Sequence, residues 1–244
     1  MKGIVLAGGL GTRFHPVTKV VNKHLLDVYD EPMVYYPIRT LARAGIEDVM
    51  VVTGDQIAQF QKLMGDGSDL GIRVSFAYQG GEGGIADALS KAEHFARGEP
   101  VVVILGDNIF QDDIGPYVRA FAGQEKGAKI LLKEVALEDA RRFGVASVED
   151  GKITGIEEKP AEPKSNLVVT GCYMYDGRVF DFIRQCVPSA RGEMEITDVN
   201  NMYINEGSMT YDSLVGWWTD AGTPASKLKA SILAALQRGV VFHQ

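Results

Sequence analysis

The first half of the chain alternates short apolar runs with segments of helical periodicity. Ile4–Ala7, Asp48–Thr53 and Val101–Leu105 are short, rich in β-branched residues and nearly all apolar, as strands are when helices cover both faces of a sheet. Between them, Met33–Ala44 and Gly83–Ala96 repeat apolar residues at helical spacing. This β-α-β-α-β order predicts a doubly wound α/β architecture with a mostly parallel sheet.

The second half has more closely spaced strands. The Asp-Gly pair within Glu149–Lys152 is a preferred hairpin turn, so we expect antiparallel strands added to one part of the sheet. The predicted strands are Lys129–Val135, Gly144–Glu149, Lys152–Glu157 and Val168–Tyr175. The predicted helices are Arg178–Cys186, Glu195–Glu206 and Pro224–Arg238. Because no repeat, low-complexity tract or linker interrupts residues 1–244, we expect a single domain.

Composition and charge exclude several kinds of partner. The contents of 45% hydrophobic and 23% charged residues are those of an ordinary globular protein. A net charge of −7 argues against nucleic-acid binding, which requires a basic surface. We expect a cytoplasmic protein without membrane association, because no apolar run approaches the roughly 20 residues of a span and no signal-peptide core develops before Gly8. Cys172 and Cys186 form no disulfide framework or metal-ligand pattern, which predicts reduced thiols.

A glycine-rich turn after the first predicted strand is the most informative segment. It reads Gly8-Gly9-Leu10-Gly11-Thr12-Arg13. Glycine lets backbone N–H groups approach an anion closely, and a basic side chain in the same turn adds charge. The turn therefore predicts a nucleotide-phosphate loop. It lacks the Lys-Ser/Thr pair of the Walker loop, and Phe14 replaces the third glycine of the dinucleotide fingerprint.

Blocks along nearly the whole chain resemble the sugar-nucleotide pyrophosphorylase family. That family's signature, G-G-x-G-T-R-x-x-P-x-T followed by K-x-L-L, runs here from Gly8 to Thr18 and from Lys23 to Leu26. Further matching blocks are Glu31–Pro37, Leu105–Phe110, Glu157–Pro160, Gly192–Asp198 and Trp218–Thr223. Within the family, the chain most resembles the glucose-1-phosphate thymidylyltransferases. The resemblance implies a Rossmann-like three-layer nucleotidyltransferase fold, with a mostly parallel mixed sheet and added antiparallel strands.

Two aspartates are candidate ligands for a metal. Asp107 follows an apolar strand, and Asp220 lies in a turn-forming segment. An aspartate in a turn is more often simply solvated, but the end of a strand beside a phosphate loop favours a functional role. Magnesium prefers carboxylate oxygens and is commonly shared between one or two carboxylates and substrate phosphates. The resemblance implies that Asp107 and Asp220 hold Mg²⁺.

Arg13 and Lys23 are the candidate phosphate-binding cations. Nucleotidyl transfer spreads negative charge over phosphate oxygens, so catalysis depends on positioning and electrostatic stabilisation. The resemblance implies that Arg13 contacts the leaving part of the triphosphate and Lys23 the phosphate near the α-position. With Asp107, they are the predicted catalytic residues, and the sugar-phosphate oxygen is the nucleophile. No chemistry is assigned to the histidines, which are His15, His24, His94 and His243.

A second glycine-rich stretch, Gly80–Gly84, precedes a predicted helix. The resemblance implies that Gln79 and the backbone at Gly84 recognise the pyrimidine edge. Asp87 differs from the residue that the family often has at the matching position, which is Gln or Glu. The predicted nucleotide-binding residues are Leu6, Gly8, Gly9, Gly11, Thr12, Arg13, Gln79, Gly84 and Asp107. The predicted residues for the sugar phosphate are Lys23, Gly144, Glu158, Lys159 and Val169.

The resemblance implies an enzyme that condenses glucose 1-phosphate with dTTP, giving dTDP-glucose for deoxysugar synthesis. The same reaction with UTP or with another sugar is one alternative, because uracil and thymine differ by one methyl group. A non-catalytic regulatory protein that binds sugar nucleotides is another, since fold does not fix function. Such a protein should have lost one of Arg13, Lys23, Asp107 or Asp220, and all four are present.

The resemblance also bears on assembly and regulation. The family commonly forms homotetramers, so we expect a homo-oligomer, either a tetramer or a dimer. Longer family members continue beyond the terminal helix and form a second nucleotide site at a subunit contact. We therefore expect weak or absent inhibition by dTDP-rhamnose at a separate site of this chain.

Overall fold

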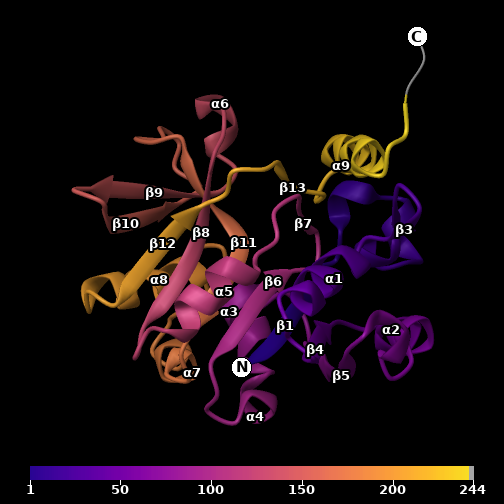
Figure 1. Ribbon diagram of the computed structural model, residues 1–244, viewed down its shortest axis with the longest axis horizontal. Coiled ribbons are helices and arrows are strands. Elements are labelled where there is room, and N and C mark those ends of the chain that lie inside the picture. The colour runs from indigo at the N-terminus through magenta and orange to yellow at the C-terminus, as the bar shows by residue number, and fades with distance from the viewer. Residues whose placement is uncertain (242–244) are drawn as a thin grey trace.

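A mixed nine-stranded sheet runs through the computed structural model, which describes residues 1–241 (Figure 1). His243, to which no chemistry is assigned, lies outside the described residues. The strands of this sheet are β1 (Lys2–Ala7), β4 (Asp48–Thr53), β5 (Arg73–Tyr78), β6 (Val101–Leu105), β8 (Ala128–Glu134), β9 (Gly144–Glu149), β10 (Lys152–Glu158), β11 (Leu167–Tyr175) and β12 (Met209–Ser213). Their order is β10-β9-β11-β6-β1-β4-β5, with β8 also paired to β11 and β12 paired to β8.

One parallel part of the sheet comprises β6, β1, β4 and β5, and β12 also pairs with β8 in parallel. Antiparallel pairing begins where β11 joins β6, and it continues through β8, β9 and β10. At the β9–β10 turn, Asp150 and Gly151 both have positive φ angles, of 50° and 73°, as the Asp-Gly hairpin turn requires. The prediction of a mostly parallel sheet with added antiparallel strands is confirmed.

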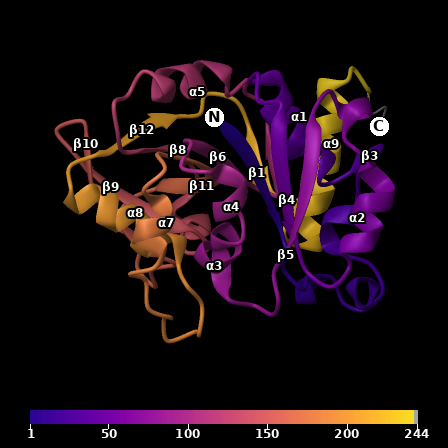
Figure 2. The same cartoon turned by 90° about the horizontal axis from the view of Figure 1, so that it is seen from below.

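Helices cover both faces of the sheet, which is why its central strands are apolar throughout. In β1, Ile4 and Leu6 point into one core, whereas Val5 and Ala7 point into the other. The first core contains α3 (Gly84–Ser90), α4 (Glu93–Ala96), α7 (Val179–Ile183) and α8 (Ile196–Asn205). The second contains α1 (Tyr35–Arg43), α2 (Ile57–Met64), α5 (Gly115–Ala122) and α6 (Leu137–Ala140). Figure 2 shows α1 and α2 across β1, β4 and β5 from α3 and α4.

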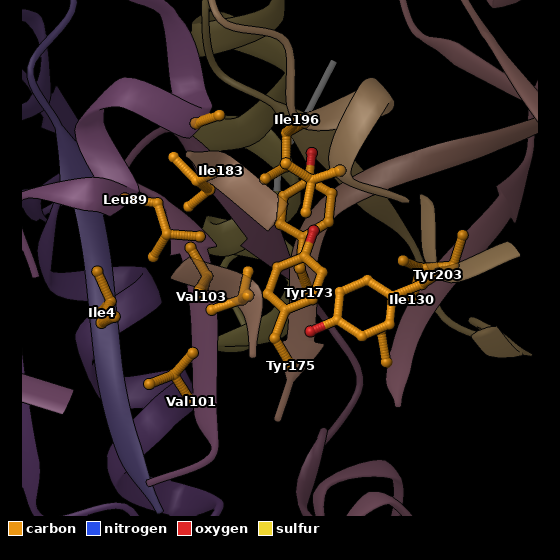
Figure 3. Close-up of a cluster of buried hydrophobic side chains, with 14 of the residues drawn as sticks. Ile4, Leu89, Val101, Val103, Ile130, Tyr173, Tyr175, Ile183, Ile196 and Tyr203 are labelled. Atoms are coloured by element: carbon orange, nitrogen blue, oxygen red, sulfur yellow. The ribbon is translucent and has the colours of Figure 1, made fainter. Parts of the chain in front are cut away.

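A cluster of tyrosines fixes α8 against β11 (Figure 3). The rings of Tyr175 and Tyr203 stack with centroids 5.7 Å apart. Each hydroxyl has a partner, because Tyr175 donates to Asn200 at 2.6 Å and Tyr203 donates to Asp176 at 2.8 Å. Buried aromatic rings with satisfied hydroxyls combine a large apolar contact with a defined orientation. This packing positions the start of α8, which carries Thr197 into the cleft described below.

Two small strand pairs complete the fold beside the main sheet. They are formed by β2 (Asp27–Val28) with β3 (Glu31–Pro32) and by β7 (Asn108–Phe110) with β13 (Trp218–Asp220). Helix α9 (Pro224–Gln237) packs against this part of the molecule through Ala230 and Ala234. Its N-terminus is a capping box formed by Thr223 and Ser226, which satisfies backbone donors there. Asp220 is the last residue of β13 and lies three residues before Thr223 of this cap. The pairing of β13 with β7 and the start of α9 therefore both restrain its position.

The predicted helix over Gly83–Ala96 is wrong in one respect, since the structure divides it into α3 and α4. The hydroxyl of Ser90 donates to the backbone oxygen of Asp87 at 2.6 Å. Lys91 and Ala92 then bond three residues back rather than four. A side chain that competes for a helical carbonyl in this way favours ending the helix.

The structure contains elements that the sequence does not predict, and one of its helices is shorter than predicted. Helices α2 and α5 and strand β5 were not predicted; β5 lies at the sheet edge and has no continuous buried run. Helix α7 ends at Ile183, three residues before the predicted end. Within the described residues, Cys172 and Cys186 are free thiols, as predicted. None of the helices in residues 1–241 has the length and apolarity needed to cross a bilayer.

Candidate active site

Most of the predicted site residues gather around one cleft of about 330 Å³. It lies where β1 and β6 end, as expected for an open α/β sheet. The predicted residues that line it are Leu6, Gly8, Gly9, Arg13, Lys23, Gln79, Gly84, Asp107, Gly144, Glu158, Lys159, Val169 and Asp220. The predicted residues Gly11 and Thr12 do not line this cleft. Gly11 turns the chain with a φ of 64°, and Thr12 begins the short 3₁₀ turn that follows.

The two predicted metal ligands converge although they are far apart in the sequence. Pairing of β13 with β7 places Asp220 opposite Asn108, the neighbour of Asp107. A Cβ added to Gly222 would lie 3.3 Å from Oδ2 of Asp107, 3.4 Å from Oδ2 of Asp220 and 3.8 Å from Nη1 of Arg13. Glycine at position 222 therefore leaves open the space that these three groups surround.

Each aspartate has a cationic partner. Lys23 Nζ lies 2.6 Å from Oδ2 of Asp107, and Arg142 Nη2 lies 3.1 Å from Oδ1 of Asp220. Burial opposes the charge of Asp107, but Lys23 holds the pKa of this carboxyl well below its usual value. Burial and the nearby Asp107 raise the pKa of Asp220 to about 6, although Arg142 acts in the opposite direction. The site thus contains two converging carboxylates that repel each other.

This donor set fits a hard divalent cation. Carboxylate oxygens are suitable ligands for Mg²⁺, which usually retains water and binds substrate phosphates in addition. Across residues 1–241, no three His, Cys, Asp or Glu side chains are placed to hold a metal ion together. The carboxylates that converge on the space beside Gly222 are those of Asp107 and Asp220.

Asn108 links the strands around Asp107 and was missed by the sequence reasoning. Its Oδ1 accepts from Gly171 N at 2.9 Å and from Trp218 Nε1 at 2.7 Å. Its Nδ2 donates to Oδ1 of Asp107 at 3.0 Å. Asn108 is 2% exposed, so these bonds join β7, β11 and β13 in a buried place. The sequence signal that could have indicated Asn108 is its position directly after Asp107 in the block Leu105–Phe110, which matches the family.

We expect Asn108→Ala to lower the free energy of unfolding by about 2–4 kcal/mol, because it leaves buried donors of Gly171 and Trp218 without an acceptor. Urea denaturation measures the change. The matched control is Asn205→Ala, at an exposed position near the end of α8, which should alter stability by less than about 0.5 kcal/mol. A loss below about 1 kcal/mol for Asn108→Ala would contradict this assignment.

A short 3₁₀ turn at Lys23–Leu25 orients Lys23. Asn22 caps it by accepting from the backbone N–H of His24 at 2.9 Å, and its Nδ2 donates to the oxygen of Ala7 at 3.2 Å. The turn is thereby attached to the end of β1. Burial, supported by the charge of Lys23, lowers the pKa of His24 to about 3. His24 is therefore neutral near pH 7 and acts in packing, not as a cation.

On one side of the cleft, Gln79 and Gly84 lie where a base is predicted to bind. Gly84 has a φ of 90°, and a Cβ there would come 2.6 Å from the backbone oxygen of Met194. The segments are joined by backbone bonds from Met194 to Gly83 and from Ala86 to Met194. Glycine is required at position 84, because both the conformation and the close approach exclude a side chain.

We expect Gly8→Ala to raise KM for the nucleotide about tenfold, comparable to the loss of one hydrogen bond. The added Cβ would lie 2.5 Å from Oε1 of Gln79, whose amide is held from its other end by Asp87. Steady-state kinetics measure the effect. Gly155→Ala is the control, since nothing lies within 4 Å of a Cβ there. An unchanged KM in Gly8→Ala would show that Gln79 moves aside freely.

Another part of the cleft carries the predicted sugar-phosphate residues. Thr197 donates to Oε2 of Glu158 at 2.7 Å, and Lys159 has a positive φ of 45°. The backbone N–H of Lys159 donates to the oxygen of Phe143 at 3.0 Å. Arg191, another residue missed by the sequence reasoning, lies 2.8 Å from Oε1 of Glu195 and 3.5 Å from Oε1 of Glu158. Lys159 Nζ lies 3.3 Å from the same Oε1 of Glu158. The carboxylate of Glu158 is thus oriented by one hydroxyl and two cationic side chains.

Comparison with known proteins identifies the family to which the chain belongs. The family model described as nucleotidyl transferase matches residues 2–235. The chain belongs to the nucleotidyl transferase family. The chain is 45% identical over 236 residues to a glucose-1-phosphate thymidylyltransferase of Neisseria meningitidis. The match covers 95% of this chain and 81% of that protein. The chain is 46% identical over 237 residues to the protein of that name from Mycolicibacterium smegmatis, with coverage of 95% and 81%.

Solved structures confirm the predicted fold of this nucleotidyl transferase. A Bacillus anthracis protein assigned as a glucose-1-phosphate thymidylyltransferase, crystallised with sucrose, matches with a TM-score of 0.92 and 49% identity over 100% of this chain and 98% of that chain. UDP-glucose pyrophosphorylase complexed with UDP-glucose matches with a TM-score of 0.85 at 24% identity, covering 97% and 99% of the two chains. At that identity the second match bears on the fold alone.

Proposed function

We propose that this nucleotidyl transferase condenses glucose 1-phosphate with dTTP to form dTDP-glucose and pyrophosphate. The observation that carries the proposal is the single cleft in which candidate base, sugar and phosphate groups meet two carboxylates. The relatives named as glucose-1-phosphate thymidylyltransferases support the choice of substrates. The cationic groups Arg13 and Lys23 and the acidic groups Asp107 and Asp220 all line this cleft, which favours an enzyme over a binding protein.

In the proposed reaction, an oxygen of the sugar phosphate attacks the α-phosphorus of dTTP. One P–O bond forms while the bond from the α-phosphorus to the bridging oxygen breaks, and pyrophosphate leaves with the electron pair. Arg13 has a planar guanidinium suited to two phosphate oxygens, whereas Lys23 provides a point charge. Their task is to position the reacting groups and stabilise charge on the oxygens.

We propose Mg²⁺ as the cofactor, held by Asp107 and Asp220. When bound, it would supply positive charge to the phosphate oxygens. The chain's own contribution is the placement of the two carboxylates, which the β7–β13 pair and the Asn108 bonds hold in position. Lys23 and Arg142, which pair with these carboxylates, would also be near the phosphates to neutralise them.

The test of the proposed function is release of pyrophosphate from glucose 1-phosphate with dTTP, UTP, ATP, CTP or GTP in separate reactions. We expect the highest kcat/KM with dTTP. A higher kcat/KM with UTP would mean that the activity is uridylyl transfer and not thymidylyl transfer. Absence of turnover with every triphosphate, in a protein that binds dTTP, would identify a binding protein instead.

We also infer a homo-oligomer and a cytoplasmic location, where nucleoside triphosphates are available. The acidic net charge of −7 supports the absence of a nucleic-acid partner. Analytical ultracentrifugation distinguishes a monomer from a dimer or tetramer. A monomer at micromolar concentration would contradict the assembly that we infer.

A further inference from the structure

The side-chain amide of Gln79 has different surroundings at its two ends. Its Nε2 lies 2.8 Å from Oδ2 of Asp87 and 3.2 Å from the backbone oxygen of Gly84. Both partners are acceptors, so the NH₂ end of the amide must face them, and the reverse orientation would bring three oxygens together. Oε1 lies on the side of Gly8, 2.5 Å from the position of an added Cβ. Because Gln79 is 6% exposed, these contacts decide its orientation.

Lys91 holds the carboxylate of Asp87 in turn. Its Nζ lies 2.7 Å from Oδ1 of Asp87, one helical turn away in sequence. The side chain of Asp87 is 17% exposed, and its two oxygens are divided between two donors. Lys91 occupies Oδ1 and Gln79 occupies Oδ2. A charge-assisted bond to Gln79 is stronger than a bond to the neutral carbonyl of Gly84, so Asp87 is the dominant partner of the amide.

We propose that Asp87, held by Lys91, fixes the amide of Gln79 so that the cleft presents an acceptor to the nucleobase and selects a pyrimidine with an N3–H group. The inference rests on the proposed function, which places a pyrimidine beside Gln79. Thymine and uracil carry N3–H and can donate to Oε1. Cytosine has an unprotonated N3 there, so two acceptors would face each other without a proton. Asp87 acts through Gln79 and is a positioning residue.

The chemistry of residue 87 decides this orientation. An amide at position 87 would contain both a donor and an acceptor and could face Gln79 in either orientation. An ionised carboxylate can only accept. In this chain the orientation of the Gln79 amide is therefore determined by the chemistry of its partner.

Competition between dUTP and dCTP tests the proposal, because these substrates differ only at the pairing edge of the base. The readout is the ratio of their kcat/KM values with glucose 1-phosphate. In Asp87→Asn, Lys91 should attract Oδ1 of the new amide and turn its NH₂ group toward Gln79. The Gln79 amide is then driven to reverse and present a donor to the base. We expect the dUTP preference to fall about tenfold or more, the scale of one mispaired hydrogen bond.

Two further variants separate orientation from general damage. In the double variant Asp87→Asn with Lys91→Ala, the new amide is free to turn its oxygen toward Gln79, so part of the lost preference should return. Asp55→Asn is the matched control, since this carboxylate accepts from the hydroxyl of Tyr78, the residue before Gln79, at 2.6 Å. Its ratio should equal that of the wild type. If Asp87→Asn does not fold, Asp87→Ala removes the acceptor and should also lower the ratio.

The outcomes distinguish this inference from the proposed function. Activity with dTTP and an unchanged dUTP-to-dCTP ratio in the Asp87 variants would overturn the role of Asp87 and leave the function intact. A wild-type preference for dUTP over dCTP below about tenfold would also overturn it. Failure of the wild type to use any pyrimidine triphosphate would instead overturn the proposed function.

Discussion

Replacement of Asp107 by Asn is expected to lower kcat about 1,000-fold or more, with little change in size or shape of the side chain. Asp107 contacts Lys23 and Asn108 and converges with Asp220 beside Gly222. The amide has no negative charge and is a poor ligand for a hard cation. Chelation of the wild-type protein by EDTA should cause a loss of similar size that added Mg²⁺ reverses. Pyrophosphate release measures both effects.

The matched control is Asp69→Asn, which makes the same change at an exposed position and should leave kcat unaltered. Because Asp107 also pairs with Lys23, thermal unfolding should be recorded for each variant. A folded Asp107→Asn protein with full activity would refute the assignment of this carboxylate. Full activity of the wild type in EDTA would refute the requirement for a metal.

The second large effect is expected for Arg13→Lys, which keeps the charge but removes the planar pair of donors. Arg13 is exposed, and its Nη1 lies on the same side of Gly222 as the two carboxylates. We expect kcat to fall about 100-fold and KM for dTTP to rise much less, because the charge on the leaving pyrophosphate develops in the transition state. Steady-state kinetics over both substrates give the two constants.

Arg43→Lys, at an exposed position on α1, is the control for loss of a guanidinium and should match the wild type. A change confined to KM in Arg13→Lys would mean that Arg13 binds the ground state and the transition state equally. That result would remove Arg13 from the predicted catalytic residues while leaving it in the nucleotide site.

Local sequence patterns were sufficient for much of the fold. The apolar runs that became β1, β4 and β6 are buried on both faces, and burial of that kind leaves a pattern along a single strand. The Asp-Gly turn before β10 depends on neighbouring residues alone. Strand β5 escaped prediction because it lies at the edge of the sheet, where half its residues face solvent.

Residue identities and a family resemblance were also sufficient to nominate the site, from the loop at Gly8 to Asp107 and Asp220. The sequence by itself thus determined which chemical groups are available and which elements carry them. The local sequence pattern did not reveal which side chains these groups contact, since Lys23 and Asp107 are separated by 84 residues and Trp218 and Asn108 by 110.

The tertiary structure decided how these groups are paired and oriented. Pairing of β7 with β13 brings Asp220 to Asp107, and Arg142 reaches Asp220 from a different segment. Even the contact between Gln79 and Asp87, which are eight residues apart, depends on how the glycine-rich turn folds before α3. The physical reason is that hydrogen bonds and ion pairs act over a few ångströms and depend on direction, so their pattern exists only once strand pairing and packing have placed the partners.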